Sequence, residues 1–272
     1  MEWVILSGKG GTGKTTVASA LIQLSNVDYY GDCDVDAPNL HLTTHSSSEP
    51  ISHPFYGMKK ALIDSTICQS CGKCFEACRY HAINTETSTY VIDAHKCEGC
   101  GVCELVCPFD AIQMVNHQDG TLILYEDHHR FSTAQLRIGS HHSGLLVSQV
   151  KQQLYKHTKP SFSIIDGSPG IGCPVQASLV GASLAILVTE PTISAIADLN
   201  RLIKMIEAYR VDMAVIINKV DLSNERAEEI VKLCEEHQIL LAGTIPYDQS
   251  VIQAVNEGKS VIEYDTEAAV TL

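Results

Sequence analysis

The chain of 272 residues is 45% hydrophobic and 19% charged, which is the composition of a soluble globular protein with enough apolar material for a core. Its formal net charge of −13 argues against binding to the phosphate backbone of a nucleic acid. No apolar run approaches the ~18 residues that a membrane span needs, and the first residues lack the basic region of a signal peptide, so we expect a cytoplasmic protein.

Short apolar segments alternate with helical patterns in the two outer parts of the chain. Strands are predicted at residues 2–7, 161–165, 184–189 and 214–217. Helices are predicted at residues 14–25, 194–209 and 225–237. This alternation is typical of βα units on a parallel sheet, so the predicted fold class is α/β with a doubly wound, mostly parallel sheet.

The loop after the first predicted strand matches the phosphate-binding pattern G-x-x-x-x-G-K-[ST]. It consists of Gly8, Lys9, Gly10, Gly11, Thr12, Gly13, Lys14 and Thr15, and we also expect a nucleotide contact from Thr16. The glycines let backbone N–H groups face phosphate oxygens at the start of a helix. Lys14 is expected to reach the β- and γ-phosphates, and the Thr15 hydroxyl to bind Mg²⁺. The alternative is a chance glycine-rich turn, but the strand before the loop and the helix after it favour binding of ATP or ADP with Mg²⁺.

With its additional lysine at position 9, this loop resembles the deviant Walker A motif of the MinD/ParA/Mrp-type ATPases, a class that includes the nitrogenase iron protein. Segments 31–40, 166–174, 215–219 and 245–248 resemble further motifs of the family. The resemblance implies a P-loop fold and a slow ATPase that depends on its dimer or on a partner.

The resemblance also implies roles for individual residues. In a homodimer, Lys9 contacts the nucleotide of the partner subunit. Asp34 orients or deprotonates the attacking water, and Asp166 holds Mg²⁺ through water. The expected contacts on the base side of the nucleotide are Asn218, Pro246, Tyr247 and Asp248.

Eight of the eleven cysteines lie in one segment that contains an internal repeat. The pattern Cys-x2-Cys-x2-Cys-x3-Cys begins at Cys68 and returns 29 residues later at Cys97. It is the spacing of bacterial two-cluster ferredoxins, in which the fourth cysteine of each run binds the other cluster. The predicted ligands of the first [4Fe–4S] cluster are Cys68, Cys71, Cys74 and Cys107. Those of the second are Cys97, Cys100, Cys103 and Cys78.

Zinc is the main alternative for these thiols. Structural zinc sites usually pair two Cys-x2-Cys knuckles about 12 or more residues apart, which describes this pattern poorly. Disulfides are less expected in a cytosolic protein. We therefore predict an α+β ferredoxin domain at residues 60–116, inserted into a P-loop ATPase domain formed by residues 1–59 and 117–272.

Cys173 is a further candidate, because it follows Asp166 at the offset of a cluster-binding cysteine in the nitrogenase iron protein. No second cysteine matches that protein, but a loose match places His142, next to His141, near the missing position. One hypothesis is a metal or redox site at the dimer face, formed by Cys173 with one of these histidines. The alternative, which we favour, is a small residue packed at the start of a helix.

Three functions are compatible with these motifs. The first is an ATP-hydrolysing iron–sulfur protein in which a nucleotide-switched homodimer is coupled to electron transfer. The second is an ATP-dependent assembly or carrier protein for iron–sulfur or other metallocofactors. The third is a MinD-like positioning ATPase that uses its ferredoxin domain only for docking.

The expected partner is a redox or client metalloprotein. The acidic segment 263–272 lacks the basic amphipathic helix of membrane-cycling members of the family. The chain also lacks a basic patch for DNA. We therefore expect neither a membrane nor a nucleic acid as partner.

Overall fold

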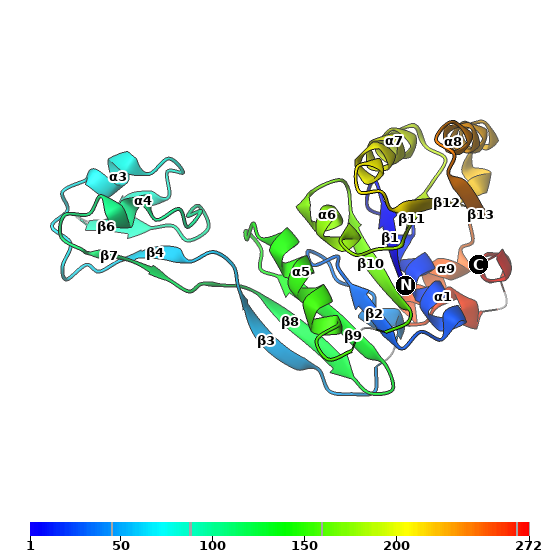
Figure 1. Ribbon diagram of the computed structural model, residues 1–272, viewed down its shortest axis with the longest axis horizontal. Helices are drawn as coiled ribbons and strands as arrows, with labels where there is room; N and C mark the ends of the chain where they lie inside the picture. Colours follow the sequence, from blue (N-terminus) through cyan, green and yellow to red (C-terminus); the bar gives the residue numbers. More distant parts are fainter. Residues whose placement is uncertain (45, 87–88, 159, 265, 272) are drawn as a thin grey trace. The chain divides into compact units, whose positions relative to one another are not determined.

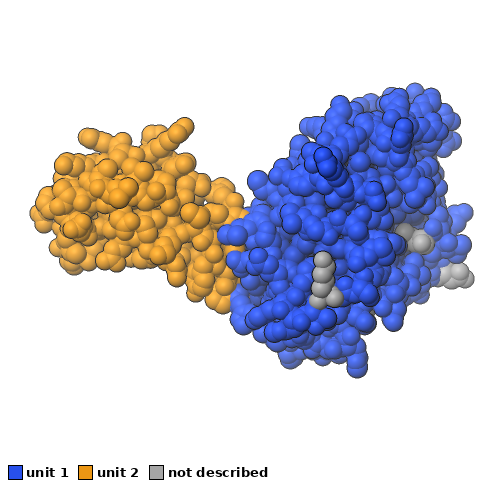
Figure 2. All heavy atoms as spheres, in the orientation of Figure 1, with its two compact units in different colours: residues 1–53, 122–135, 143–272 blue, residues 54–121, 136–142 orange. Residues whose placement is uncertain are grey.

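The computed structural model describes residues 1–44, 46–86, 89–158, 160–264 and 266–271. The chain divides into two compact units, which Figure 2 shows in blue and orange. The larger unit comprises residues 1–53, 122–135 and 143–272, and the smaller comprises residues 54–121 and 136–142.

The main sheet has the strand order β13-β12-β11-β1-β10-β2-β9-β8-β3 (Figure 1). In chain order these strands are β1 (Glu2–Ser7), β2 (Tyr29–Asp32), β3 (Ile51–Tyr56), β8 (Gln118–Glu126), β9 (Arg130–Leu136), β10 (Ser163–Pro169), β11 (Leu184–Thr189), β12 (Asp212–Asn218) and β13 (Leu240–Ile245). From β13 to β9, each strand pairs in parallel with its neighbour. The prediction of a mostly parallel α/β sheet is therefore confirmed.

Helices cover the sheet on both faces. The helices of the larger unit are α1 (Lys14–Ser25), α2 (His41–Thr44), α5 (Ser143–Leu154), α6 (Cys173–Leu179), α7 (Ile193–Glu207), α8 (Asn224–Glu236), α9 (Ser250–Asn256) and α10 (Glu267–Thr271), with 3-10 turns η1 (Val220–Leu222) and η2 (Val261–Glu263). The successive residues Val4, Ile5 and Leu6 are all fully buried. Since neighbouring residues of a strand point to opposite faces, apolar layers must lie on both sides of β1.

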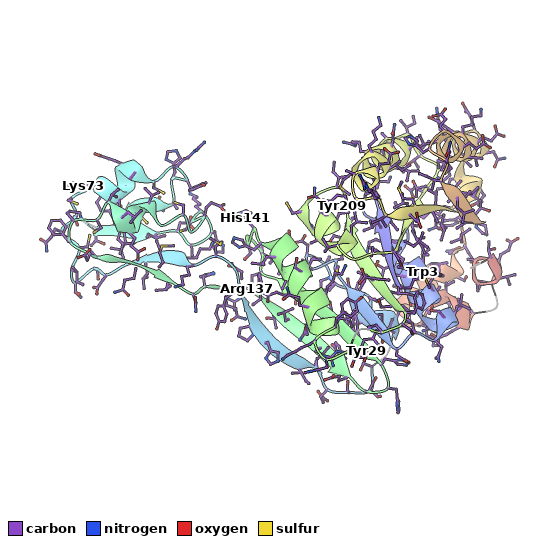
Figure 3. The ribbon with its side chains drawn as sticks, in the orientation of Figure 1. Trp3, Tyr29, Lys73, Arg137, His141 and Tyr209 are labelled. Carbon is purple, nitrogen blue, oxygen red and sulfur yellow. The ribbon has the colours of Figure 1, made fainter. Side chains whose placement is uncertain are left out.

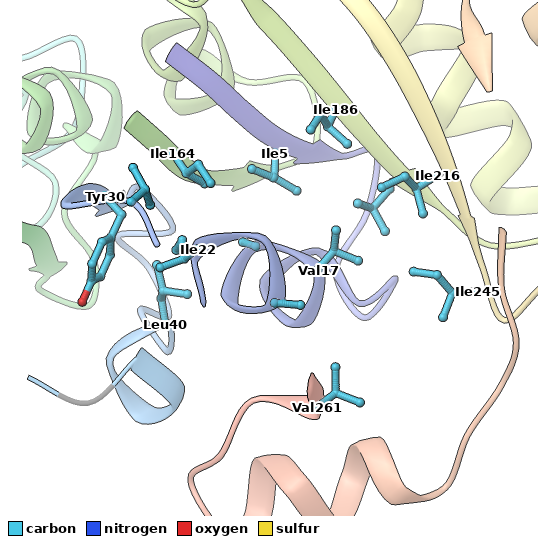
Figure 4. Close-up of a cluster of buried hydrophobic side chains, with 14 of the residues drawn as sticks. Ile5, Val17, Ile22, Tyr30, Leu40, Ile164, Ile186, Ile216, Ile245 and Val261 are labelled. Carbon is cyan, nitrogen blue, oxygen red and sulfur yellow. The ribbon is translucent and has the colours of Figure 1, made fainter. Parts of the chain in front are cut away.

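One of these layers lies between α1 and the sheet, as Figure 4 shows. Val17 and Ile22 of α1 contact an apolar row contributed by successive strands: Ile5, Ile164, Ile186 and Ile216. Val261 of η2 closes the layer from the C-terminal part of the chain. This packing fixes the start of α1, and with it the phosphate loop, against the ends of the strands.

In its described residues, the smaller unit has two antiparallel strand pairs of its own and two short helices. The pairs are β4 (Lys60–Ile63) with β7 (Ile112–Val115) and β5 (Ile83–Glu86) with β6 (Thr89–Ile92); the helices are α3 (Lys73–Ala77) and α4 (Val102–Leu105). Positions 29 residues apart share a positive φ: Ser70 with Gly99, Gly72 with Gly101, and His81 with Asp110. The sequence repeat is therefore also a repeat of backbone conformation. This unit extends beyond the predicted insert of residues 60–116 at both ends.

In the part of the chain that the structure describes, no helix is long and apolar enough to cross a membrane. The segment 263–272, on which the expected absence of a membrane partner was based, includes Asp265 and Leu272, which lie outside the described residues.

Candidate functional site

The loop between β1 and α1 approaches the end of β12 very closely. Gly13 has φ +94°, and a Cβ added there would lie 2.2 Å from Nδ2 of Asn218. That same Nδ2 donates a hydrogen bond of 2.7 Å to the carbonyl oxygen of Thr12. Only glycine allows both this backbone conformation and this approach. The motif glycine thus lets an amide of β12 hold the loop in place.

Four of the residues predicted for phosphate and Mg²⁺ lie together at the carboxyl ends of β1, β2 and β10. The Lys14 ammonium, only 6% exposed, lies 2.6 Å from Oδ1 of Asp166 and 3.9 Å from Oδ2 of Asp34. The Thr15 hydroxyl donates a hydrogen bond of 2.7 Å to Oδ2 of Asp166. One cation, one hydroxyl and two carboxylates therefore converge where the phosphate loop begins its helix.

The Lys14 ammonium and the carboxylates around it shift one another's pKa. Burial alone would lower the pKa of Lys14, but the nearby carboxylates of Asp166, Asp32 and Asp34 outweigh it and raise that pKa. Burial raises the pKa of Asp34, and the Lys14 charge opposes that rise. The site therefore keeps Lys14 as an ammonium, which is the form that attracts phosphate.

Asp32 has a supporting role that the sequence analysis did not assign. Its carboxylate is fully buried and accepts hydrogen bonds of 3.0 Å from the backbone N–H groups of Asp34, Asn39 and Leu40. Burial raises the pKa of Asp32 to about 7. These bonds fold the segment after β2 back on itself and place Asp34 near Lys14. The signal was the Asp-Cys-Asp sequence at the end of a strand, of which only the second aspartate was singled out.

Glu190 is a second residue that the sequence analysis missed. One of its carboxylate oxygens lies 2.8 Å from the ammonium of Lys9, and the other lies 2.9 Å from that of Lys219. Lys9 also contacts the hydroxyls of Thr192 and Ser194, and Lys219 donates a hydrogen bond to the carbonyl of Gly11. Glu190 directly follows β11, so its place at the carboxyl end of a strand could have identified it. Lys9 is therefore bound to residues of the same chain.

The two ion pairs of Glu190, with Lys9 and Lys219, should make the stability of the protein depend on pH. Burial opposes ionisation of Glu190, but hydrogen bonds from Lys9 and Lys219 lower its pKa below the ordinary 4.5. A lowered pKa in the folded state stabilises the fold at neutral pH, and this contribution disappears as the pH falls through the folded-state pKa. We expect Glu190→Gln to lower the melting temperature at pH 7 and to have a smaller effect once the pH falls below the ordinary pKa of 4.5.

The matched control is Glu229→Gln, which removes a carboxylate paired with Arg226 on the surface of α8. It should change the melting temperature little at either pH, because exposed pairs contribute little. A Glu190→Gln deficit that keeps the same size as the pH falls from neutral to below 4.5 would contradict the assignment.

The residues predicted for the base side of the nucleotide line one cavity of about 170 Å³. Asn218, Pro246, Tyr247 and Asp248 contribute to it, and Thr16 contributes from α1. The other lining residues are mainly apolar: Val17, Lys219, Ile245, Val251, Ile252, Val261 and Ala268. A mostly apolar cavity with a few polar groups is what an aromatic base requires.

In the smaller unit, the eight repeat cysteines surround two separate cavities. Cys68, Cys71, Cys74 and Cys107 line the first. Cys78, Cys97, Cys100 and Cys103 line the second. These are the two sets that the sequence pattern assigned to two clusters, each with its fourth thiol from the other half of the repeat. The β-strands contribute to the walls in the same repeat-related way, with Tyr90 and Ile63 at the first cavity and Ala61 and Ile92 at the second.

Backbone N–H groups point at several of these sulfurs. Ser70, Ala82 and Ala111 each donate to a cysteine sulfur over 3.4 Å, namely Cys68, Cys78 and Cys107. Burial raises the pKa of Cys74, and it raises that of Cys103 to about 11. Among the described residues, no group of three or more His, Cys, Asp or Glu side chains is arranged to hold a single metal ion.

Cys173 and His142 belong to different units. Cys173 is exposed at the first residue of α6 in the larger unit. His142, in the smaller unit, has its Nδ1 3.1 Å from Oδ2 of Asp119. His141, labelled in Figure 3, is exposed. A joint site of Cys173 with either histidine stays a prediction.

Comparison with known proteins agrees with this geometry. Residues 3–261 match the model of the CobQ/CobB/MinD/ParA nucleotide binding domain. The uncharacterized protein MJ0578 of Methanocaldococcus jannaschii is 34% identical over 229 residues, which cover 82% of this chain and 80% of that protein. A second protein of that organism, MJ0579, is 24% identical over 269 residues, covering 96% and 91%.

The structural neighbours show the same fold. The septum site-determining protein MinD of Pyrococcus horikoshii, complexed with Mg-ADP, aligns with a TM-score of 0.58 at 19% identity. The alignment covers 99% of this chain and 91% of that one. The chain therefore belongs to the CobQ/CobB/MinD/ParA family of nucleotide-binding proteins.

Proposed function

We propose that this protein hydrolyses ATP and couples its nucleotide state to electron transfer through two [4Fe–4S] clusters in the smaller unit. The observation that carries the iron–sulfur part is the division of eight thiols into two cavities of four. Residues 60–116 would form a ferredoxin-like domain inserted into a P-loop ATPase domain of residues 1–59 and 117–272.

The ATPase part is supported by family membership and by the convergence of Lys14, Thr15, Asp34 and Asp166. The loop N–H groups and Lys14 hold the phosphates and balance their charge. Mg²⁺ would be held by the Thr15 hydroxyl and, through water, by Asp166, and would neutralise phosphate charge. Asp34, placed by Asp32, orients the attacking water. The cavity beside Asn218 and Tyr247 receives the base.

The donor chemistry of the smaller unit suits iron–sulfur clusters. Each cavity offers four thiols from two loops, together with mainly small or apolar wall residues and backbone N–H groups directed at sulfur. Cys₄ sets of this spacing bind [4Fe–4S] clusters, which supply one-electron transfer. The positive-φ residues Gly72 and Gly101 turn the loops so that three of their cysteines face one cavity. The following helices, α3 and α4, direct the fourth cysteine to the other cavity.

A homodimer is part of this proposal. Lys9 is bound to Glu190 of its own subunit, whereas the family resemblance implies that it contacts the nucleotide of the partner. Release of Lys9 from Glu190 would then accompany formation of the nucleotide-bound dimer. The segments around Asp34 and Asp166 lie beside the phosphates and would carry the nucleotide state to a redox or client metalloprotein.

A MinD-like positioning ATPase is the second candidate, because the chain shares its fold with the MinD of Pyrococcus horikoshii. In that function the smaller unit would only dock a partner. A carrier protein for iron–sulfur or other metallocofactors differs in that the clusters would leave the chain.

A redox titration followed by EPR separates these functions. Protein purified without oxygen is titrated with no nucleotide, with Mg·ADP and with a non-hydrolysable Mg·ATP analogue. Coupled electron transfer predicts a nucleotide-dependent midpoint shift of about 30 mV or more, which is ~0.7 kcal/mol for one electron. Identical midpoints in all three states would contradict coupling. Loss of iron to an apo-acceptor on ATP hydrolysis would favour the carrier.

A further inference from the structure

Lys60, the first residue of β4, is a buried lysine beside the second thiol set. It is 4% exposed, and its ammonium donates a hydrogen bond of 2.5 Å to the carbonyl oxygen of Cys97. The neighbouring residue Ala61 lines the cavity of Cys78, Cys97, Cys100 and Cys103. The acceptor is a neutral carbonyl, so this contact does not itself pair the ammonium with an acid. The ammonium of Lys60 is therefore held in a low-dielectric setting next to one thiol set.

The chain folds tightly over this contact. A Cβ added to Gly99 would lie 2.4 Å from the carbonyl oxygen of Lys59 and 3.1 Å from Cβ of Met58. Gly99 also has φ +68°, a conformation that favours glycine. The loop that carries Cys97 thus packs directly on the backbone that precedes Lys60, and this packing excludes water from the ammonium.

Lys60 breaks the symmetry of an otherwise repeated unit. Asp64 donates its backbone N–H to the carbonyl of Ala111 over 2.8 Å, and 29 residues later Asp93 donates to Ala82 over the same distance. The same offset relates Lys60 to Thr89, which carries no charge. The thiol set of Cys68, Cys71, Cys74 and Cys107 therefore lacks a repeat-related counterpart of this lysine.

Asp119 is an acidic group whose pKa is affected by the charge of Lys60. Its carboxylate, 1% exposed, is contacted by Nδ1 of His117 at 3.0 Å and by Nδ1 of His142 at 3.1 Å. Burial opposes ionisation, but the hydrogen bond from His117 and the charge of Lys60 lower the pKa of Asp119. The carboxylate is thus tied to two histidines, whereas the ammonium is tied to Cys97.

We propose that Lys60 raises the reduction potential of the cluster held by Cys78, Cys97, Cys100 and Cys103 above that of its neighbour. The inference rests on the proposed function, because it concerns the two clusters assigned there. Uptake of one electron adds one negative charge to a cluster, and a buried ammonium beside a ligand stabilises that charge. Because the first thiol set has no such lysine, the two clusters would differ in reduction potential, and an added electron would be more stable on the second.

The test compares midpoint potentials of the full chain, purified without oxygen, by EPR-monitored titration after the iron content is measured. Lys60→Gln removes the charge but keeps an N–H donor for the Cys97 carbonyl. We expect it to lower the higher midpoint by at least a tenfold change in the reduction equilibrium, about 59 mV for one electron. Asp119→Asn removes a negative charge and should move the same midpoint upward.

The matched control is Lys73→Gln at an exposed lysine beside the first thiol set, labelled in Figure 3. Solvent screens its charge, so both midpoints should stay at their wild-type values. Unchanged midpoints in an iron-replete Lys60→Gln variant overturn the inference. If that variant loses iron, an unchanged Asp119→Asn variant overturns it instead. Wild-type protein without iron overturns the proposed function and this inference together.

Discussion

Replacement of Lys14 by methionine should both destabilise the protein and stop ATP hydrolysis. The buried ammonium lies 2.6 Å from Asp166 and 3.9 Å from Asp34, so its loss leaves carboxylates unpaired. Breaking a buried pair in this way costs about 3–5 kcal/mol in the free energy of unfolding. Loss of the charge at the transferred phosphate should reduce the hydrolysis rate at least ~100-fold.

Chemical denaturation at two pH values tests the physical cause. At lower pH the unpaired carboxylates bind protons, so the deficit of Lys14→Met relative to wild type should be smaller at pH 5 than at pH 8. Lys232→Met, at an exposed lysine of α8, is the control and should change neither the stability nor the rate. A Lys14→Met protein as stable as wild type at pH 8 would show that the buried charge cluster does not form.

The iron content of double cysteine variants should show which cysteines share a cluster. If each fourth cysteine crosses to the other half of the repeat, Cys78 and Cys97 belong to one site. The double variant Cys78→Ser/Cys97→Ser should then keep about four of about eight iron atoms per chain. The double variant Cys68→Ser/Cys78→Ser removes a ligand from both sites and should lose nearly all iron.

If each run of four cysteines instead binds its own cluster, Cys78→Ser/Cys97→Ser should lose nearly all iron, and Cys68→Ser/Cys78→Ser should keep about half. The two double variants therefore distinguish the two arrangements. Cys173→Ser is the control, because this exposed thiol lies in the other unit. It should keep the wild-type iron content. A loss of iron in Cys173→Ser would instead revive the hypothesis of a metal site at that residue.

The sequence predicted the parts of the molecule that depend on local signals. The glycines and Lys14 of the phosphate loop determine its conformation within a few residues, and β1, α1 and β11 have the predicted bounds. The cysteine repeat likewise carries its loop geometry in residues such as Gly72 and Gly101, which have positive φ. In each case the residues that determine the backbone conformation lie within the segment that adopts it.

Other features depend on contacts between distant segments and could not be predicted in this way. In the sequence, Lys60 resembles any polar residue at a strand end, and its contact with the loop of Cys97 and Gly99 is made by a segment distant in the chain. Glu190 gains its role from Lys9 and Lys219, which come from two other strand ends. The strands β3, β8 and β9 were not predicted, because their polar and apolar residues mix and their pairing is set by the sheet they join.

A metal and sulfide analysis of wild-type protein purified without oxygen tests whether the two thiol sets hold iron–sulfur clusters. We expect about eight iron atoms and about eight acid-labile sulfides per chain, with an EPR signal of reduced [4Fe–4S] clusters after dithionite. The signal should persist when Mg·ATP is bound. Zinc bound to the chain, with neither sulfide nor such a signal, would contradict the assignment of both thiol sets.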